Sequence, residues 1–215
     1  MHLKRHKSPK KWPIKRKGTK YIVKPNFSTN QGVPVLIALR DMLELAKNRK
    51  EVKKAIREKQ VLLNDRKIKD EKNNVLLFDV ISIVPTNKNY KLQLSNFGKF
   101  MFEEVKDAKW QQKIVKVVDK KILNGKKVQI NLNDGHNFLY NGQLNINDSV
   151  VFGFKEKKII KVLQLKEKAK AIVYAGKHAG KEGVIESLDN NKKMIELDVG
   201  GSKINVLIKQ IMVVE

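Results

Sequence analysis

Hydrophobic residues between positions 35 and 59 recur at the spacing of an α-helix. One amphipathic helix is predicted to begin at Val35, with an apolar face formed by Val35, Leu36, Leu39, Met42, Leu43 and Ala46. A second helix is predicted over the segment EVKKAIREK, with Val52, Ala55 and Ile56 on its inner side. This part of the chain therefore begins with two short helices that each bury one side.

Beyond residue 60 the pattern changes to the alternation that is typical of strands. Short apolar runs flank an Asn64-Asp65 turn and predict a small β ribbon that ends at Pro85. Asn-Gly and Asp-Gly turns then separate further alternating residues, which mark hairpins: Val128, Ile130, Leu132, Phe138, Tyr140, Leu144 and Ile146. Only FEEVKDAKW predicts another helical turn or two. The fold class is therefore α+β and mostly β.

The segment AIVYAGKHAGKEGVIESL carries the sharpest local signal. A strand from Ala171 to Tyr174 leads into a loop with three glycines, Gly176, Gly180 and Gly183, and a new strand begins at Val184. Glycine permits positive φ and close backbone approach, which a tight structural loop requires. Three side chains that can carry positive charge stand on this loop: Lys177, His178 and Lys181. It is not a phosphate-binding loop of nucleotide hydrolases, because no Gly-Lys-Ser/Thr follows and no helix begins there.

Proline and glycine punctuation divides the chain. Four of the five prolines precede residue 35, no glycine occurs between Gly32 and Gly98, and ten of the twelve glycines follow residue 97. We therefore expect four parts: an extended basic arm (1–34), a compact unit (35–86), a central β domain (87–165) and a small β-barrel (166–215). Units this small gain stability from packing on each other or on a ligand.

The net charge of the chain narrows the classes of ligand that it can be expected to bind. The chain has 46 Lys and Arg against 22 Asp and Glu, a formal net charge of +24, and its first 40 residues contain 11 basic residues and no acid. A protein this basic most often binds a polyanion, and nucleic acid is the abundant one. Cysteine is absent, which excludes a disulfide framework and a thiolate metal site. No apolar run reaches the roughly 20 residues of a membrane span.

The candidate RNA-binding residues lie in the arm and on the helices. In the arm they are Lys4, Arg5, Lys7, Lys10, Lys11 and Trp12, with Trp12 proposed to stack on a base or enter a protein groove. On the outer sides of the two helices they are Arg40, Lys47, Arg49, Lys50, Lys53, Lys54 and Arg57. The alternatives are a solvated tail, a solvated helix face and, for the glycine loop, a barrel corner with incidental lysines.

Histidines offer little evidence of catalysis or metal binding. His2 and His6 are four residues apart with no third ligand nearby, so we expect no metal. Asp134 and His136 flank a turn, and we interpret them as a turn aspartate beside an exposed histidine, because no other group converges on them. We expect neither a cofactor nor a small-molecule substrate.

Two segments resemble known RNA-binding modules. Two helices followed by VLLND and a closing DVISI resemble the S-four-type RNA-binding domain. AGKHAGKEGVI resembles the KOW motif of ribosomal proteins and transcription elongation factors, whose loop docks on RNA. The resemblance implies that Lys177, His178 and Lys181 are candidates for RNA contact, although Lys177 and His178 stand where a glycine-rich stretch is usual.

The order of the modules resembles one family. HLKRHKSPKKW, the S-four-type unit, LNDGHNFLYNGQLNINDSV, the KOW loop and a terminal IKQIMVV together resemble the archaeal and eukaryotic S-four-e family of small-subunit ribosomal proteins, in its shorter archaeal form. The resemblance implies a cytoplasmic structural protein of the ribosome without catalytic activity. Its implied partners are small-subunit ribosomal RNA and neighbouring ribosomal proteins, with no membrane contact.

Two other classes of protein use the same modules. An RNA-modification protein would need a catalytic aspartate on a larger domain, and the nearest match, Leu39-Arg40-Asp41, lies on a predicted helix of the binding unit. A transcription elongation accessory factor would need a companion domain that the sequence does not show.

Overall fold

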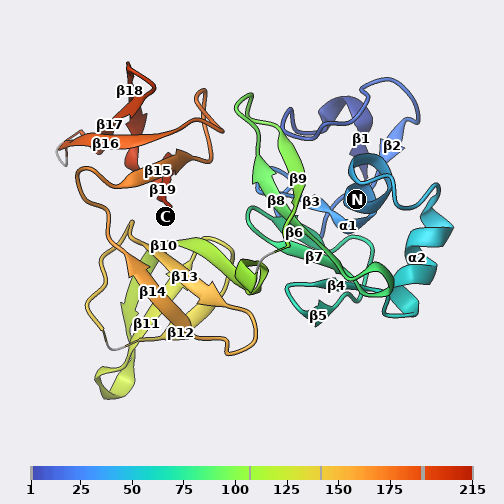
Figure 1. The fold of residues 1–215 in the computed structure, drawn as a ribbon, viewed down its shortest axis with the longest axis horizontal. Helices are drawn as coiled ribbons and strands as arrows, with labels where there is room; N and C mark the ends of the chain where they lie inside the picture. The colour runs from blue at the N-terminus through green and yellow to red at the C-terminus, as the bar shows by residue number, and fades with distance from the viewer. Residues whose placement is uncertain (1, 107, 141, 190–191, 215) are drawn as a thin grey trace. The chain divides into compact units, whose positions relative to one another are not determined.

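The computed structural model describes residues 2–106, 108–140, 142–189 and 192–214. The chain forms two compact units, which are considered separately below (Figure 1). Unit 1 comprises residues 1–95 and 99–111, and unit 2 comprises residues 96–98 and 112–215. Both are built mainly of antiparallel strands.

A five-stranded antiparallel sheet is the centre of unit 1. Its strands, in spatial order, are β5 (Arg66–Lys67), β4 (Val61–Leu63), β7 (Val80–Ile83), β8 (Lys88–Leu94) and β9 (Phe100–Glu104). The predicted Asn64-Asp65 turn joins β4 to β5, and both residues have positive φ, 50° and 62°, as a two-residue hairpin requires. The Asn64 side chain also fixes this turn to β7, because its Oδ1 accepts a hydrogen bond from the Val80 N–H at 2.9 Å.

The two predicted helices are present, but the first is shorter than its pattern suggests. Helix α1 spans Val35–Ile37 and continues as a π-helical turn, Ala38–Met42. Glu44 then has φ 53°, which ends the turn before the predicted Ala46 position. Helix α2 spans Arg49–Arg57, and the Asn48 side chain caps it by accepting from the Glu51 N–H at 3.0 Å.

The basic arm packs onto this unit. Strand β1 (Leu3–Lys4) pairs with β2 (Tyr21–Ile22), and β3 (Gly32–Pro34) pairs with β6 (Asn74–Leu76). Trp12 is 3% exposed, and its indole Nε1–H donates to the Gly32 carbonyl oxygen at 2.9 Å. The position of Trp12 therefore differs from the one predicted for a base-stacking residue, because the protein's own core covers the ring.

The first sheet ends later than the predicted boundary at residue 86. Strand β8 pairs with β7 in register Ile81 to Tyr90, and β9 pairs with β8. The segment FEEVKDAKW, predicted to form a helical turn or two, begins in β9 and ends in a 3-10 turn, Ala108–Gln111. Pro85 marks a short 3-10 turn, Val84–Thr86, rather than the end of the sheet. The first strand of the next sheet begins at Gln112.

Unit 2 contains two five-stranded antiparallel sheets. The first has the order β12 (Asn137–Leu139), β11 (Val128–Leu132), β10 (Gln112–Ile122), β13 (Ser149–Gly153) and β14 (Ile159–Leu163). The second has the order β18 (Ser202–Leu207), β17 (Met194–Val199), β16 (Glu182–Asp189), β15 (Lys170–Val173) and β19 (Ile211–Val213). Each has its own apolar core, one around Val117 and Ile130 and one around Ile185 and Leu197.

A buried lysine joins the two sheets of unit 2. Lys116 of β10 is 3% exposed, and its Nζ donates to the carbonyl oxygens of Ile208 and, at 2.8 Å, Ile211, the first residue of β19. Burial lowers the pKa of Lys116 to about 8, from an ordinary value of 10.5. Ser149 adds a second link, since its Oγ accepts from the Val213 N–H at 2.9 Å.

We expect Trp12→Ala to lower the free energy of unfolding by about 3–5 kcal/mol, because it removes a buried ring and leaves the Gly32 carbonyl unpaired. Urea denaturation checks this, and amide exchange in β1 and β2 should rise. Phe97→Ala is the matched control, because Phe97 is 91% exposed and its loss should change stability by less than about 0.5 kcal/mol. Equal effects of the two substitutions would contradict the anchoring role.

The buried Lys116 makes stability rise with pH. Between about pH 8 and 10.5 the folded protein has a neutral Lys116 while the unfolded chain keeps that proton. This group therefore adds a slope of about 1.4 kcal/mol per pH unit to the free energy of unfolding. Urea denaturation at a series of pH values should show that Lys116→Met loses this slope. An unchanged slope would contradict the assignment.

Candidate nucleic-acid interface

A basic groove of about 840 Å³ lies within unit 1. Its walls come from the arm, from α1 and the π-helical turn, and from the start of α2. None of the described residues that line it is acidic, and its basic members are His2, Arg5, Lys24, Arg40, Arg49 and Lys72. Two aromatic residues, Tyr21 and Phe27, also line it. A concave surface of this composition favours an anionic ligand with apolar parts.

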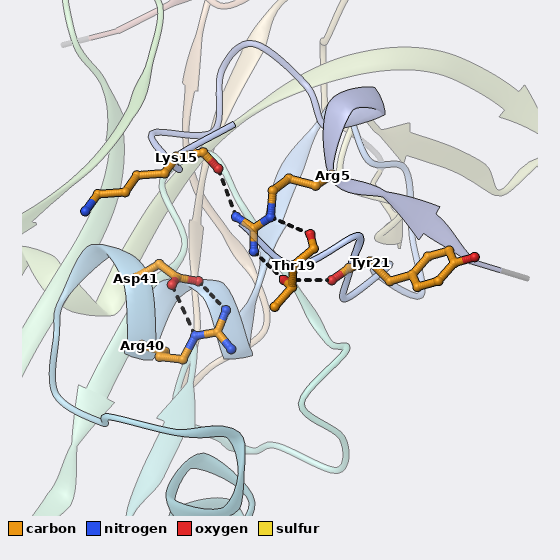
Figure 2. Close-up of polar contacts among 6 residues, drawn as sticks. All are labelled: Arg5, Lys15, Thr19, Tyr21, Arg40 and Asp41. Carbon is orange, nitrogen blue, oxygen red and sulfur yellow. Dashed lines mark hydrogen bonds and ion pairs between the residues drawn. The ribbon is translucent and has the colours of Figure 1, made fainter. Parts of the chain in front are cut away.

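Arg5 organises the arm's side of the groove. Its guanidinium donates from Nε to the Thr19 carbonyl at 2.8 Å, from Nη1 to the Lys15 carbonyl at 2.8 Å and from Nη2 to Thr19 Oγ1 at 2.7 Å. Figure 2 shows the guanidinium between Lys15 and Thr19. Arg5 was a predicted RNA contact, and here its nitrogen atoms fold the loop from residue 15 to 19 back beside β1.

Arg40 and Arg49 are both oriented by carboxylates. Arg40 donates to the two carboxylate oxygens of Asp41, with Nη2 2.8 Å from Oδ2, and its side chain is 30% exposed (Figure 2). Arg49 donates from Nε to Glu71 Oε1 at 2.8 Å, and its Nη2 also contacts this oxygen. Such two-pronged contacts fix the plane of a guanidinium.

Glu71 is a buried residue between β5 and β6, and its pairing with Arg49 attaches α2 to this segment. Its side chain is 1% exposed, whereas that of Arg49 is 53% exposed. Lys53 Nζ lies 3.9 Å from Glu71 Oε1. The hydrogen bond with Glu71 is the main cause that raises the pKa of Arg49. The carboxylate therefore positions the basic helix without covering its outer side.

The outer side of α2 is a continuous basic surface. Lys50, Lys53, Lys54 and Arg57 are all exposed, as is Lys47 just before the helix. Lys54 makes one exposed ion pair, with Glu58 at 3.8 Å, which leaves the excess of positive charge. The predicted stripe on the second helix is thus present on the surface.

The remaining arm candidates have different environments. Lys4, Lys7 and Lys10 are exposed. Lys11 lies with its Nζ 5.8 Å from the centre of the Phe100 ring, and burial lowers its pKa. Lys11 therefore contributes to packing beside Trp12 as well as to charge.

The glycine loop lies in unit 2, between β15 and β16. Gly176 and Gly180 have φ of 89° and 90°, and the Gly180 N–H donates to the Val173 carbonyl at 2.7 Å. At Gly183 a Cβ would lie 2.2 Å from the Asp198 carbonyl oxygen. The positive φ of Gly176 and Gly180 lets the loop close, and the absence of a side chain at Gly183 lets β17 pack closely against it. Lys177 is exposed, while His178 and Lys181 are half-buried.

The Asp134 and His136 pair differs from the exposed turn that the sequence indicates. The Asp134 side chain is 4% exposed and lies 2.9 Å from both Lys113 Nζ and His136 Nδ1. Burial by itself raises the pKa of Asp134, but the His136 hydrogen bond and the Lys113 charge together hold it well below its usual range. Asp134 does lie in the predicted turn, where it accepts from the His136 N–H, but the premise that no other group converges on the pair was wrong, because Lys113 is distant in sequence. The triad is a buried ion pair with a half-exposed histidine.

Sequence patterns also missed four residues of the groove: Tyr21, Lys24, Phe27 and Lys72. Lys24 belongs to the basic run of the arm, but neither aromatic residue stands in a recognisable motif. Their convergence depends on the fold of the arm. Among the described residues, no group of three possible metal ligands occurs, and no helix is long and apolar enough to cross a membrane.

Two family models match parts of the chain: the RS4NT (NUC023) domain at residues 1–27 and the Ribosomal family S4e at residues 86–159. Small ribosomal subunit protein eS4 of Methanocella arvoryzae is 37% identical over 87% of this chain and 80% of its own. The eS4 of Nanoarchaeum equitans is 34% identical over 93% and 89%. The crystal structure of 30S ribosomal protein S4e from Thermoplasma acidophilum has the same fold, with TM-score 0.74, 20% identity and coverage of 86% and 95%.

Clustered cations on small β-rich modules are typical of the nucleic-acid-binding class of proteins. The chain aligns with these relatives over most of its own length and most of theirs. The chain belongs to the S4e family of small ribosomal subunit proteins, as its motifs and their order indicated. It is thus a structural ribosomal protein and not an enzyme.

We expect Glu71→Gln to lower the free energy of unfolding by about 1–3 kcal/mol, because it weakens a buried charge-assisted pair with Arg49. Amide exchange in α2 should rise, since the helix loses its attachment. The matched control is Glu58→Gln, which removes an exposed pair and should change stability by less than about 1 kcal/mol. Equal, small effects of both substitutions in urea denaturation would show that Glu71 does not hold the helix.

Proposed function

We propose that this chain binds small-subunit ribosomal RNA through three basic surfaces and thereby supports the structure and assembly of the subunit. These surfaces are the groove of unit 1, the outer side of α2 and the glycine loop of unit 2. The proposal also places the chain in cytoplasmic ribosomes, beside neighbouring small-subunit proteins. The observation that carries it is the groove, whose lining is basic and includes no described acid.

The physical basis is phosphate neutralisation. The free protein has a net charge of +24, and its positive groups repel one another. Contact with RNA phosphates relieves that repulsion and releases the counterions of the RNA. Lysines on an exposed helix side suit a phosphate backbone better than a base edge. The surfaces therefore favour recognition of RNA shape over recognition of sequence, with the arginines of the groove as oriented donors.

In cells, ultraviolet crosslinking of the tagged full chain should yield RNA fragments concentrated at a few sites of small-subunit ribosomal RNA. Crosslinked protein should sediment with the small subunit. Crosslinks spread over messenger RNA, or concentrated on transfer RNA, would overturn the proposal.

In vitro, the triple variant Lys50→Ala, Lys54→Ala, Arg57→Ala should bind small-subunit ribosomal RNA more weakly than the wild type does. Its slope of log affinity against log salt should be shallower by up to about 0.9 for each phosphate that the variant no longer neutralises. A control variant removes three exposed lysines of unit 2, Lys155, Lys157 and Lys158, and should alter the slope less. Equal effects of the two variants would show that α2 is not a preferred surface.

A further inference from the structure

Two aromatic rings are exposed in the basic groove. Tyr21 is 47% exposed and Phe27 is 46% exposed, and both line the groove with the arginines. A single exposed ring is ordinary on a protein surface. Here two exposed rings share one concave surface, and the charged residues of that surface are cations. This combination indicates a ligand that has both phosphates and flat apolar faces.

The Tyr21 ring is held in place before any ligand arrives. Its backbone lies in β2, and its carbonyl accepts a hydrogen bond from Thr19 Oγ1 at 3.2 Å, which in turn accepts from Arg5 (Figure 2). The His2 ring lies with its centre 5.2 Å from that of Tyr21, at 46°. Lys20 Nζ lies 5.5 Å from the same ring centre. These contacts limit the ordering that binding would require.

The arginines of the groove are also prearranged. Arg40 and Arg49 are each fixed by a carboxylate, Asp41 and Glu71, yet their side chains remain 30% and 53% exposed. An oriented guanidinium is a strong donor to phosphate oxygens. The lining thus combines flat rings with fixed cations.

We propose that this groove binds an unpaired nucleotide of the RNA, with its base stacked on Tyr21 or Phe27 and its flanking phosphates at Arg40 and Arg49. This inference rests on the proposed function and specifies its ligand. A duplex hides the faces of its bases, so exposed rings gain nothing from it, whereas an unpaired base stacks on them. The volume, about 840 Å³, lies within the range of roughly 300–1,000 Å³ of small-molecule sites.

The α2 surface makes a separate contribution. Its exposed side has lysines and Arg57, so it binds phosphates of paired and unpaired RNA alike. The two surfaces therefore predict different selectivity: α2 supplies general affinity, and the groove supplies preference for an unpaired nucleotide.

The test compares two RNA hairpins that differ by one bulged nucleotide, with 2-aminopurine at the bulge. The full chain should bind the bulged hairpin more tightly by anisotropy and should change the fluorescence of the 2-aminopurine. The double variant Tyr21→Leu, Phe27→Leu should lose roughly 5- to 150-fold of affinity for the bulged hairpin, which is the effect of removing one stacking platform. Its affinity for the plain hairpin should stay unchanged.

Two further variants make the result specific. Tyr21→Phe combined with Phe27→Tyr keeps both rings and should keep the preference. Phe97→Leu removes a ring that is 91% exposed outside the groove and should also keep it. Urea denaturation should show that all the variants are folded, since every ring that is changed is exposed.

The outcomes separate this inference from the proposed function. If wild type binds both hairpins equally and the double variant changes neither affinity, the nucleotide site is wrong. If crosslinks in cells still lie on small-subunit ribosomal RNA in that case, the proposed function stands. If the full chain binds neither hairpin and its crosslinks lie elsewhere, both fail.

Discussion

The burial of Trp12 is the interaction on which the geometry of unit 1 depends. It lies in a segment with 11 basic residues and no acid among the first 40, where charge repulsion opposes compaction. One ring 3% exposed, with its indole bonded to the Gly32 carbonyl, fixes this segment against β3. The Phe100 N–H adds a bond to the Lys11 carbonyl at 2.9 Å. The arm can therefore form one wall of a groove, which a solvated tail cannot.

Two acids of unit 1 determine how that wall is used. Glu71 and Asp41 each pair with one arginine, but the groove stays basic because five Lys and Arg side chains line it. The two acids also fix the planes of the guanidinium groups with which they pair. Arg5 is different, since its guanidinium donates to backbone carbonyls and to the Thr19 hydroxyl. It keeps its full charge while it shapes the loop that precedes Tyr21.

Local signals predicted local structure well. The α2 helix, the Asn64-Asp65 turn and the glycine loop all appear where their spacing placed them, because neighbouring residues decide caps, turns and φ. Predictions that depended on distant residues did less well. Pro85 did not end the sheet, since β8 pairs with β7 beyond it. The mostly β fold was predicted from alternating apolar residues and turns, and the S4e family was recognised from the order of the motifs.

The candidate site was harder to predict than the fold. The basic side of α2 follows from helical spacing, but the groove requires the arm to fold back. The sequence left Trp12 between stacking on a base and entering a protein groove, and did not place its ring in the core of unit 1. Tyr21 and Phe27 have no local pattern that separates an exposed ring from a buried one. Spacing alone cannot determine which aromatic residue the chain covers.

Counting lysines does not measure the RNA-binding surface, because unit 2 buries two of them three residues apart in one strand. Lys113 and Lys116 are 2% and 3% exposed. Lys113 is paired with the buried Asp134, whereas Lys116 contacts carbonyl groups and has a lowered pKa. One cation thus stabilises a sheet by an ion pair and the other joins two sheets by hydrogen bonds. Both are unavailable to phosphate, so excess charge becomes a binding surface only where the fold leaves it exposed and oriented.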